Sequence, residues 1–396
     1  MFQLANYAIN GLIFLLVLAG QIYFYRAARR RLERFLGSLW ARLALILLGV
    51  ALAGAVARVW FDNFGIHWVW WSIGPVSRSL SFAAGIWTAG SAGATLVLFA
   101  GALLRRRNRV VAGSGPGERT RRELLAKAVQ ATAALVPFGA AAYGTLLVRS
   151  RFVLREVDFP VSGLSPALEG LRLVLLSDIH YGPYLSPAEL TRVIDMANEP
   201  RPHLTLVTGD LITRASDPLE SCLAHLARLR AEAGVFGCLG NHEIYAGAEN
   251  ITETLGRRLG IEFLRHRSRL LEFGGGRLNL AGVDYQRQRK PYLVGAGQMI
   301  VPGAVNLLLS HNPDVFPVAA GLGYDLVVGG HTHGGQVTVE ILEQTLNMGR
   351  FFTPFVAGLY RRGSASLYVS RGIGTINLPM RLGAKPEVAL LRLRRA

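Results

Sequence analysis

The chain has 396 residues, of which 51% are hydrophobic, a mean hydropathy of +0.31 and a formal net charge of +17. This length accommodates two or more domains, and the hydropathy is too high for a protein that is soluble along its whole length. Residues 1–150 hold 17 Lys and Arg against four Asp and Glu, and all six Trp precede residue 90. The N-terminal part is therefore a different kind of polypeptide from the rest.

Four apolar stretches, each about 20 residues long and nearly free of charge, explain this difference. Each is long enough to cross a bilayer, whereas helices of a soluble core alternate apolar and charged faces. The stretches are residues 4–24, 43–61, 80–104 and 128–148. We expect a bundle of four transmembrane helices within residues 1–149 and a separate domain at residues 150–396.

Arginines between these stretches predict their orientation. Six Arg follow the first stretch and seven follow the third, whereas the second loop has one acid, one terminal Arg and three Trp. Because positive charge stays in the cytoplasm, the domain after Arg149 is expected on the periplasmic or extracellular face of the membrane. Nucleic-acid binding explains these arginines poorly because they adjoin the spans, so no nucleic-acid partner is expected.

The segment TRRELLAK, Thr120–Lys127, resembles the twin-arginine export signal. In that signal, Ser or Thr and two Arg precede an apolar pair and often a Lys. The resemblance implies the twin-arginine export machinery as a partner, and this machinery carries folded proteins. Paired arginines are also common in cytoplasmic loops, which leaves an ordinary loop as the alternative.

From residue 171 the pattern changes to alternating strands and helices, which predicts the start of a parallel sheet. Polar residues follow each strand, and sites form at the C-terminal ends of parallel strands. Five strand ends carry metal-binding residue types: Asp178 and His180, Asp210, Asn241 and His242, His311, and finally His331 and His333. Five of the nine histidines are thus expected to converge.

These residue types suit a pair of divalent ions such as Mn, Fe or Zn. One carboxylate can bridge two ions, and two ions can hold a phosphoryl oxygen and activate a water. A His that does not bind metal can protonate the leaving alkoxide. Any one of these residues alone is better explained as a helix cap or a surface histidine, but all five motifs in this order are not.

The ordered motifs DxH, GD, GNHE, a late His and GHTHGGQ resemble the calcineurin-like metallophosphoesterase superfamily over residues 168–395. Residues 368–393 look like the C-terminus of its membrane-associated bacterial branch. That branch includes exported phosphodiesterase-like proteins and relatives that act on lipid A precursors. The resemblance implies an α/β metallophosphoesterase domain of two packed β-sheets flanked by helices.

The resemblance also implies a role for each motif residue. Asp178, His180 and His333 would bind the first metal, Asp210 would bridge, and Asn241, His311 and His331 would hold the second. His242 would be the general acid and an anion contact. The family often has Asp where this chain has Glu243, a departure with little expected effect.

The remaining candidates have less specific explanations. Cys222 and Cys238 belong to no metal-spaced cluster and are expected to be buried thiols, although an outer location would permit a disulfide. Arg214 and Tyr181 adjoin motifs and are candidates for substrate contact. The other histidines are expected at the membrane interface (His67) or as surface and packing residues (His203, His225 and His266).

We therefore expect a membrane-anchored phosphoesterase with two metals that hydrolyses phosphodiester or pyrophosphate bonds, of a lipid-linked, amphiphilic or nucleotide substrate. One alternative is a pyrophosphatase of the UDP-2,3-diacylglucosamine type that faces the cytoplasm. Another is a membrane transport or sensor protein with a metal-binding domain, although the spans have almost none of the ionisable residues that transport requires. A third, a catalytically inactive module, should have lost ligands, and none is missing.

Overall fold

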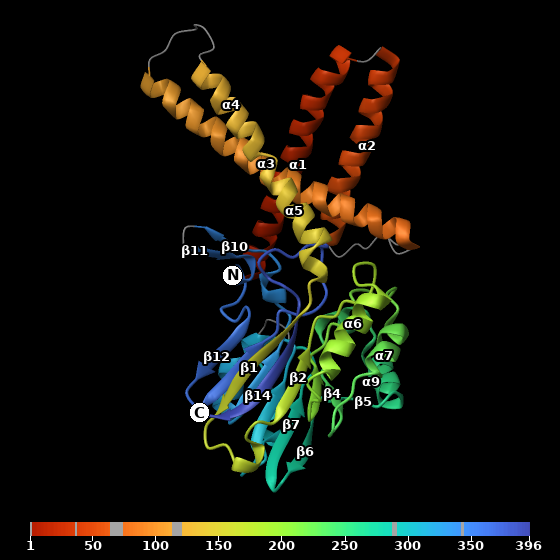
Figure 1. Ribbon diagram of the computed structural model, residues 1–396, viewed down its shortest axis with the longest axis vertical. Helices are drawn as coiled ribbons and strands as arrows, with labels where there is room; N and C mark the ends of the chain where they lie inside the picture. The colour runs from red at the N-terminus through yellow and green to blue at the C-terminus, as the bar shows by residue number, and fades with distance from the viewer. Residues whose placement is uncertain (1, 36–37, 64–73, 113–120, 287–290, 342–343) are drawn as a thin grey trace. The chain divides into compact units, whose positions relative to one another are not determined.

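The computed structural model describes residues 2–35, 38–63, 74–112, 121–286, 291–341 and 344–396 (Figure 1). These residues form two compact units, Met1–Leu147 and Val148–Ala396. The expected interfacial His67 and the three Trp of the second loop lie outside the described residues, as does Thr120 of the export-like segment.

The described residues of the first unit form helices, with a short turn between the last two of them. Two segments of its described residues are long and apolar enough to cross a membrane, Arg78–Leu103 and Ala128–Ser150, and Leu39–Gly54 is a shorter apolar helix. The first of these segments covers the third expected span, residues 80–104, to within one residue, and the second contains the fourth, residues 128–148. The helices are α1 (Phe2–Phe35), α2 (Ser38–Asn63), α3 (Gly74–Ala112), α4 (Arg121–Ala133) and α5 (Val136–Leu146).

Small residues and buried hydrogen bonds join the helices of this unit. A Cβ added to Gly20 of α1 would collide with Thr95 of α3, so the two helices approach closely there. Beside this contact, Gln21 donates to the Ser91 hydroxyl at 2.9 Å and accepts from the Trp87 indole at 2.7 Å. Close approach at glycine and hydrogen bonds between helices are typical of packing inside a bilayer.

The second unit contains two six-stranded mixed sheets and a separate hairpin. The first sheet has the spatial order β1 (Val153–Val161), β14 (Glu387–Arg395), β2 (Arg172–Leu176), β3 (Leu204–Val207), β4 (Val235–Gly237) and β5 (Ile261–Phe263). The second has the order β12 (Gly358–Arg362), β13 (Ala365–Val369), β9 (Leu326–Gly329), β8 (Val305–Leu309), β7 (Gly276–Gly282) and β6 (Arg267–Phe273). The hairpin is β10 (Thr338–Ile341) with β11 (Gln344–Asn347).

Three apolar cores explain why the strands are hydrophobic throughout. Leu173 and Leu175 of β2 contribute to the core shared with the second sheet, whereas Val174 and Leu176 contribute to the core under the helices. Because successive side chains point to opposite faces, a strand buried on both faces reads as a continuous apolar run. The expected α/β domain with two packed sheets is confirmed.

Helices cover the outer faces of both sheets (Figure 1). Ser186 begins the first of them with a capping box in which its side chain and that of Glu189 each bond the other's backbone N–H. This is the amphipathic helix that the sequence predicts. The helices are α6 (Pro187–Asn198), α7 (Leu219–Leu226) and α9 (Glu249–Arg258) on the first sheet, and α10 (Phe316–Leu322) on the second.

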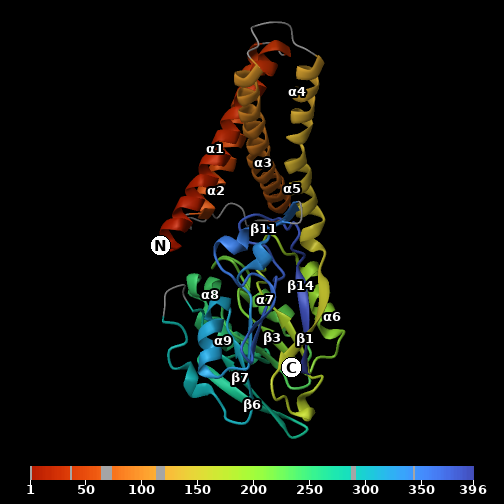
Figure 2. The same cartoon turned by 90° about the vertical axis from the view of Figure 1, so that its left-hand side faces the viewer.

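Strand register aligns the ends that carry the polar motifs. β2, β3 and β4 are parallel neighbours, with Leu173 opposite Leu204 and Thr205 opposite Val235. The expected parallel β-α-β-α-β start is therefore confirmed. β14 lies parallel to β1 and antiparallel to β2, and Figure 2 shows β1 and β14 side by side.

Candidate metal centre

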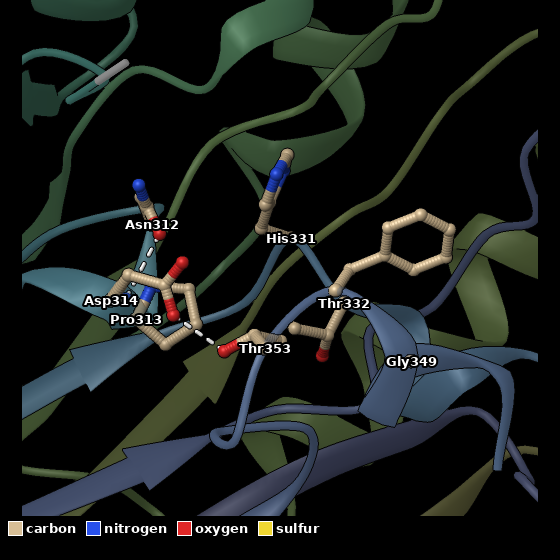
Figure 3. A pocket seen from close by; sticks show the side chains of 8 residues that line it. Asn312, Pro313, Asp314, His331, Thr332, Gly349 and Thr353 are labelled. Atoms are coloured by element: carbon tan, nitrogen blue, oxygen red, sulfur yellow. Dashed lines mark hydrogen bonds between the residues drawn. The ribbon is translucent and has the colours of Figure 1, made fainter. Parts of the chain in front are cut away.

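The polar strand ends of both sheets meet at one place. β2 leads to Asp178 and His180 and β3 to Asp210, while β8 and β9 lead to three further histidines. A pocket of about 180 Å³ adjoins this place, between the loops that follow β8 and β9 (Figure 3). The two sheets thus supply ligand-type side chains from opposite sides of one site.

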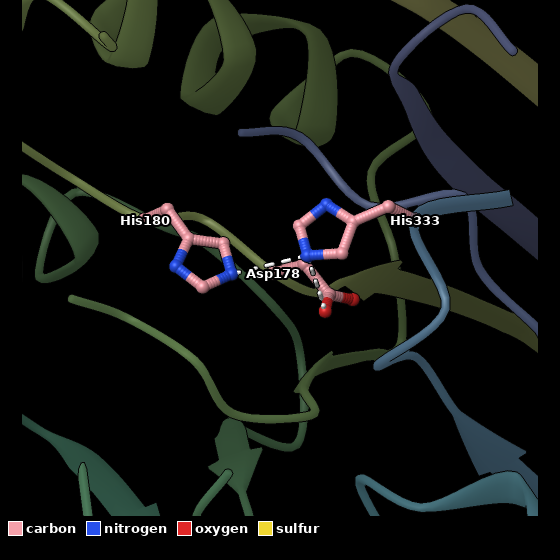
Figure 4. Close-up of side chains that lie close together, drawn as sticks. All are labelled: Asp178, His180 and His333. Carbon is pink, nitrogen blue, oxygen red and sulfur yellow. Dashed lines mark hydrogen bonds and ion pairs between the residues drawn. The ribbon is translucent and has the colours of Figure 1, made fainter. Parts of the chain in front are cut away.

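The first cluster contains Asp178, His180 and His333, whose ligand atoms all lie within 4.8 Å of one another (Figure 4). The Nε2 atoms of the two imidazoles are 3.1 Å apart, and His333 Nε2 is 3.4 Å from Asp178 Oδ1. All three side chains are buried. Three buried donor atoms that converge in this way suit one ion.

The second cluster contains Asp210, His311 and His331. His311 Nε2 lies 3.0 Å from Asp210 Oδ2 and 3.2 Å from His331 Nδ1. The same Asp210 oxygen is 3.6 Å from His180 Nε2 of the first cluster. Asp210 therefore lies between the clusters, where a bridging carboxylate belongs.

Asn241 tests whether this site fits metal ions. It is the first residue of a short helix, α8 (Asn241–Tyr245), and its buried Oδ1 has no hydrogen-bond partner among the described residues. An unpaired buried oxygen costs about 1–3 kcal/mol, which a cation would offset. Imidazole, carboxylate and amide oxygen together suit Mn, Fe or Zn, so the residues present fit the group.

Backbone strain is concentrated at the two clusters. Positive φ costs a non-glycine residue of the order of 1–3 kcal/mol and persists where the surroundings hold it in place. Five cluster residues have such a φ: Asp178 (51°), His180 (45°), Asp210 (54°), His331 (72°) and His333 (52°). This strain turns the side chains at successive strand ends toward one another.

Outer hydrogen bonds orient the imidazoles. His180 Nδ1 lies 2.9 Å from the Thr213 hydroxyl, and His311 Nδ1 lies 2.6 Å from the Thr208 carbonyl. Fixing Nδ1 in this way leaves Nε2 directed into the site, as in known metal centres. The sequence motifs did not predict either threonine.

Burial sets the protonation of the ligand-type groups. It lowers the pKa of His180 and of His331 to about 3, so both are neutral at pH 7, the form that binds metal. Burial also raises the pKa of Asp178 to about 6. At His311 burial favours a lower pKa, but the Asp210 carboxylate outweighs it and raises the pKa to about 9.

Glu243 has a larger structural role than the sequence indicated. Its buried carboxylate accepts backbone N–H bonds from Gly240 (2.8 Å), Asp210 (2.9 Å) and Leu211 (2.7 Å). It thereby ties the loop after β3 to the loop after β4. The position at which the chain departs from the family's usual Asp fixes the backbone of the central carboxylate.

Arg381 was not predicted at all. It is completely buried and donates to the carbonyls of Gly374 (3.0 Å) and Arg371 (2.7 Å), while its Nη2 lies 3.5 Å from His333 Nδ1. Burial lowers its pKa to about 10, so it remains a cation. The one signal was that it falls within the C-terminal segment that carried the family resemblance.

His242 lies at the edge of the clusters and is partly exposed. Its Nδ1 is 2.7 Å from the Thr213 carbonyl, its backbone N–H donates to Asp210 Oδ1, and its ring is 4.9 Å from that of His180. Because Thr213 occupies Nδ1, Nε2 is the nitrogen that remains for a substrate.

Most of the remaining candidates lie outside the site. The Tyr181 side chain is buried in the core, with its hydroxyl 3.3 Å from that of Ser221. His203 accepts from the Arg172 backbone, His225 bonds the Ser221 carbonyl, and His266 is exposed. Both cysteines are buried and free, as expected. The clusters therefore draw only on the motif residues.

Comparison with known proteins agrees with this geometry. The sequence model described as Calcineurin-like phosphoesterase matches residues 171–335. The chain is 31% identical over 233 residues to Phosphodiesterase YaeI of Escherichia coli K12, an alignment that covers 56% of this chain and 82% of YaeI. The chain belongs to the calcineurin-like phosphoesterases. The buried His and Asp clusters agree with this membership.

Other relatives of this phosphoesterase come from vertebrates and bacteria. It is 34% identical over 273 residues to a "Transmembrane protein with metallophosphoesterase domain" of Danio rerio, covering 65% of this chain and 60% of that protein. It is 27% identical over 272 residues to "Uncharacterized metallophosphoesterase YkuE" of Bacillus subtilis, covering 67% and 93%. The phosphoesterase thus spans less than two thirds of its zebrafish relative's length.

Proposed function

We propose that this phosphoesterase binds two divalent ions and hydrolyses phosphodiester or pyrophosphate bonds at the membrane. Asp178, His180 and His333 would hold one ion, Asn241, His311 and His331 would hold the other, and Asp210 would contribute its carboxylate to both. The observation that carries this assignment is that the His and Asp clusters meet at Asp210, whose Oδ2 approaches a histidine of each, beside the unpaired amide oxygen of Asn241.

The bound ions supply Lewis-acid stabilisation of a phosphoryl oxygen and a nucleophile from water at neutral pH. His242 acts on the leaving group. Its Nδ1–H donates to the Thr213 carbonyl, which leaves Nε2 as the nitrogen that delivers a proton to the departing oxygen. The hydrogen bond from the His242 backbone N–H to Asp210 Oδ1 fixes the position of this histidine relative to the proposed bridging carboxylate.

The first unit anchors the enzyme through four spans in a bacterial inner membrane, with the catalytic unit on the outer side. Two segments are apolar enough by composition, α1 and α3 pack through Gly20 and buried hydrogen bonds, and arginines flank the first and third spans. Export of the folded domain by the twin-arginine machinery fits this orientation. A lipid-linked or otherwise amphiphilic phosphate is the substrate class that such an anchor favours, with a nucleotide as the other candidate.

The full chain, purified in detergent, tests this proposal. We expect about two transition-metal ions per chain and hydrolysis of bis(4-nitrophenyl) phosphate that a chelator abolishes and Mn²⁺ restores. The His266→Ala variant, which removes an exposed histidine outside the site, is the matched control and should behave as the parent. Activity that survives complete chelation, or fewer than one ion per active chain, would refute the proposal.

A further inference from the structure

A pocket beside the second cluster has no role in the mechanism above. Its volume of about 180 Å³ is similar to that of cavities of about 150 Å³ that bind a molecule the size of benzene, so it is enough for a small organic group. Its lining comes from the loop after β8, the loop after β9 and the segment around the short helix η7 (Met348–Phe351): Asn312, Pro313, Asp314, His331, Thr332, Gly349, Phe352 and Thr353. His331 belongs to both the pocket and the second cluster, so a group bound here lies next to the phosphate.

Asp314 is the acidic side chain of this lining (Figure 3). Its Oδ1 accepts from the Thr353 hydroxyl at 2.5 Å, and its backbone N–H bonds Asn312 Oδ1 at 2.9 Å. In the part of the chain that the structure describes, Oδ2 has no hydrogen-bond donor and no Lys or Arg pairs with the carboxylate. Partial burial raises the pKa of Asp314. One carboxylate oxygen is therefore left to accept a bond within the pocket.

Asn312 and Thr332, two further polar side chains of the lining, are already engaged. Asn312 donates its Nδ2 to the Gln286 carbonyl at 2.8 Å and uses its Oδ1 to accept from Asp314. The Thr332 hydroxyl donates to the Val356 carbonyl. Pro313 and Phe352 form the apolar part of the pocket wall. A carboxylate is an acceptor only, so this pocket selects a short group that carries a donor and disfavours a second phosphate or a carboxylate.

We propose that the pocket binds the ester group of the substrate next to the scissile phosphate, and that Asp314 selects esters bearing a hydroxyl or ammonium group. This inference rests on the proposed phosphodiesterase function and narrows its substrates to phosphodiesters of small polar alcohols or amino alcohols. Within it, Pro313 and Phe352 contact the carbon chain of the ester and Asp314 Oδ2 accepts from its donor.

Four 4-nitrophenyl phosphodiesters test the inference on the full chain in detergent with Mn²⁺, because 4-nitrophenolate leaves from each of them. The second ester group is ethyl, glyceryl, 2-aminoethyl or choline. Glyceryl and aminoethyl offer a hydroxyl and an ammonium donor, choline has the positive charge without an N–H, and ethyl has neither. Of the glyceryl and aminoethyl esters, the one that is hydrolysed better should have a kcat/KM about 10- to 100-fold above that of the ethyl ester. This is the effect of one hydrogen bond to a charged group.

The Asp314→Asn variant should reduce this ratio about 10-fold or more. Glu272→Gln, which changes an exposed acid of β6, is the matched control and should keep the parental ratio. A parental ratio in Asp314→Asn, with metal-dependent hydrolysis of the ethyl ester intact, would overturn the pocket assignment alone. Equal preference for the choline and aminoethyl esters would overturn selection of a donor. No hydrolysis of any ester would overturn the proposed function as well.

Discussion

At the scale of single residues, Asp210 is expected to affect metal binding most, because its Oδ2 approaches one histidine of each cluster. Asp210→Asn keeps the size of the side chain but removes the charge that the two proposed cations would share. We expect the variant to lose metal from both clusters and activity with it, measured by metal analysis and turnover of bis(4-nitrophenyl) phosphate. Asp195→Asn, an exposed carboxylate on α6, is the control and should retain both. Retention of two ions by Asp210→Asn would rule out a bridge.

The proposed role of His242 as general acid predicts a loss of rate without a loss of metal. His242→Ala should keep both ions but lose rate by on the order of 10²–10⁴-fold, the usual contribution of a general acid. The loss should shrink for leaving groups of low pKa because these need no proton. A series of aryl phosphodiesters measures this dependence. An equal loss across the series would show that His242 acts only through its charge.

The hydrogen bonds from buried Arg381 to backbone carbonyls predict that this residue stabilises the fold. Arg381→Met leaves the carbonyls of Gly374 and Arg371 without their donor, and each buried unpaired acceptor costs about 1–3 kcal/mol. We expect the free energy of unfolding of the metal-free protein to fall by about 2–6 kcal/mol in denaturant titrations. Arg362→Met, an exposed arginine at the end of β12, should change it by less than about 0.5 kcal/mol. Equal stability of the two variants would contradict a structural role for Arg381.

At the scale of elements, the end of β9 passes very close to the loop after β2. A Cβ at Gly330 would collide with the Ser177 hydroxyl and with Asp178 Oδ2. Gly330→Ala should therefore displace Asp178 and weaken metal binding at the first cluster by 10-fold or more, measured by competition with a chelator of known affinity. Gly321→Ala in α10 has nothing within 4 Å of the new methyl group and should bind metal as the parent does. Unchanged affinity in Gly330→Ala would show that the loops move apart freely.

Elements also show what sequence patterns can and cannot predict. Apolar runs ending in Asp, Asn or His predicted the parallel order of β2, β3 and β4 and the convergence of their ends, since hydrophobicity and spacing are local properties. No local sequence pattern indicated that β14 inserts between β1 and β2, because this pairing joins residues more than 200 positions apart. The structural roles of Arg381 and Glu243 could not be predicted from the sequence for a related reason. Their roles depend on backbone carbonyls and N–H groups, which every residue has.

At the scale of the whole molecule, the arginines of the first and third loops predict that the catalytic unit is outside. A C-terminal alkaline phosphatase fusion should be active, and protease added to intact spheroplasts should digest the domain. If the twin-arginine machinery exports it, replacing Arg121 and Arg122 with Lys should retain the domain inside, whereas the same change at Arg29 and Arg30 should not. Protection from protease in intact spheroplasts of the parent, with cleavage only after lysis, would reverse the topology.

The position of β14 has a consequence for biosynthesis. β1 has β14 as its one neighbour in the first sheet, and Val153 pairs with Glu387 while Val161 pairs with Arg395. A ribosome that adds 5–20 residues per second needs roughly 12–48 s to go from the first of these strands to the last. Throughout that interval β1 lacks its partner strand, and the edge of the apolar strand β2 that β14 later covers is open to chaperones and to aggregation. A translocase that accepts only finished domains would therefore act only after β14 has been synthesised.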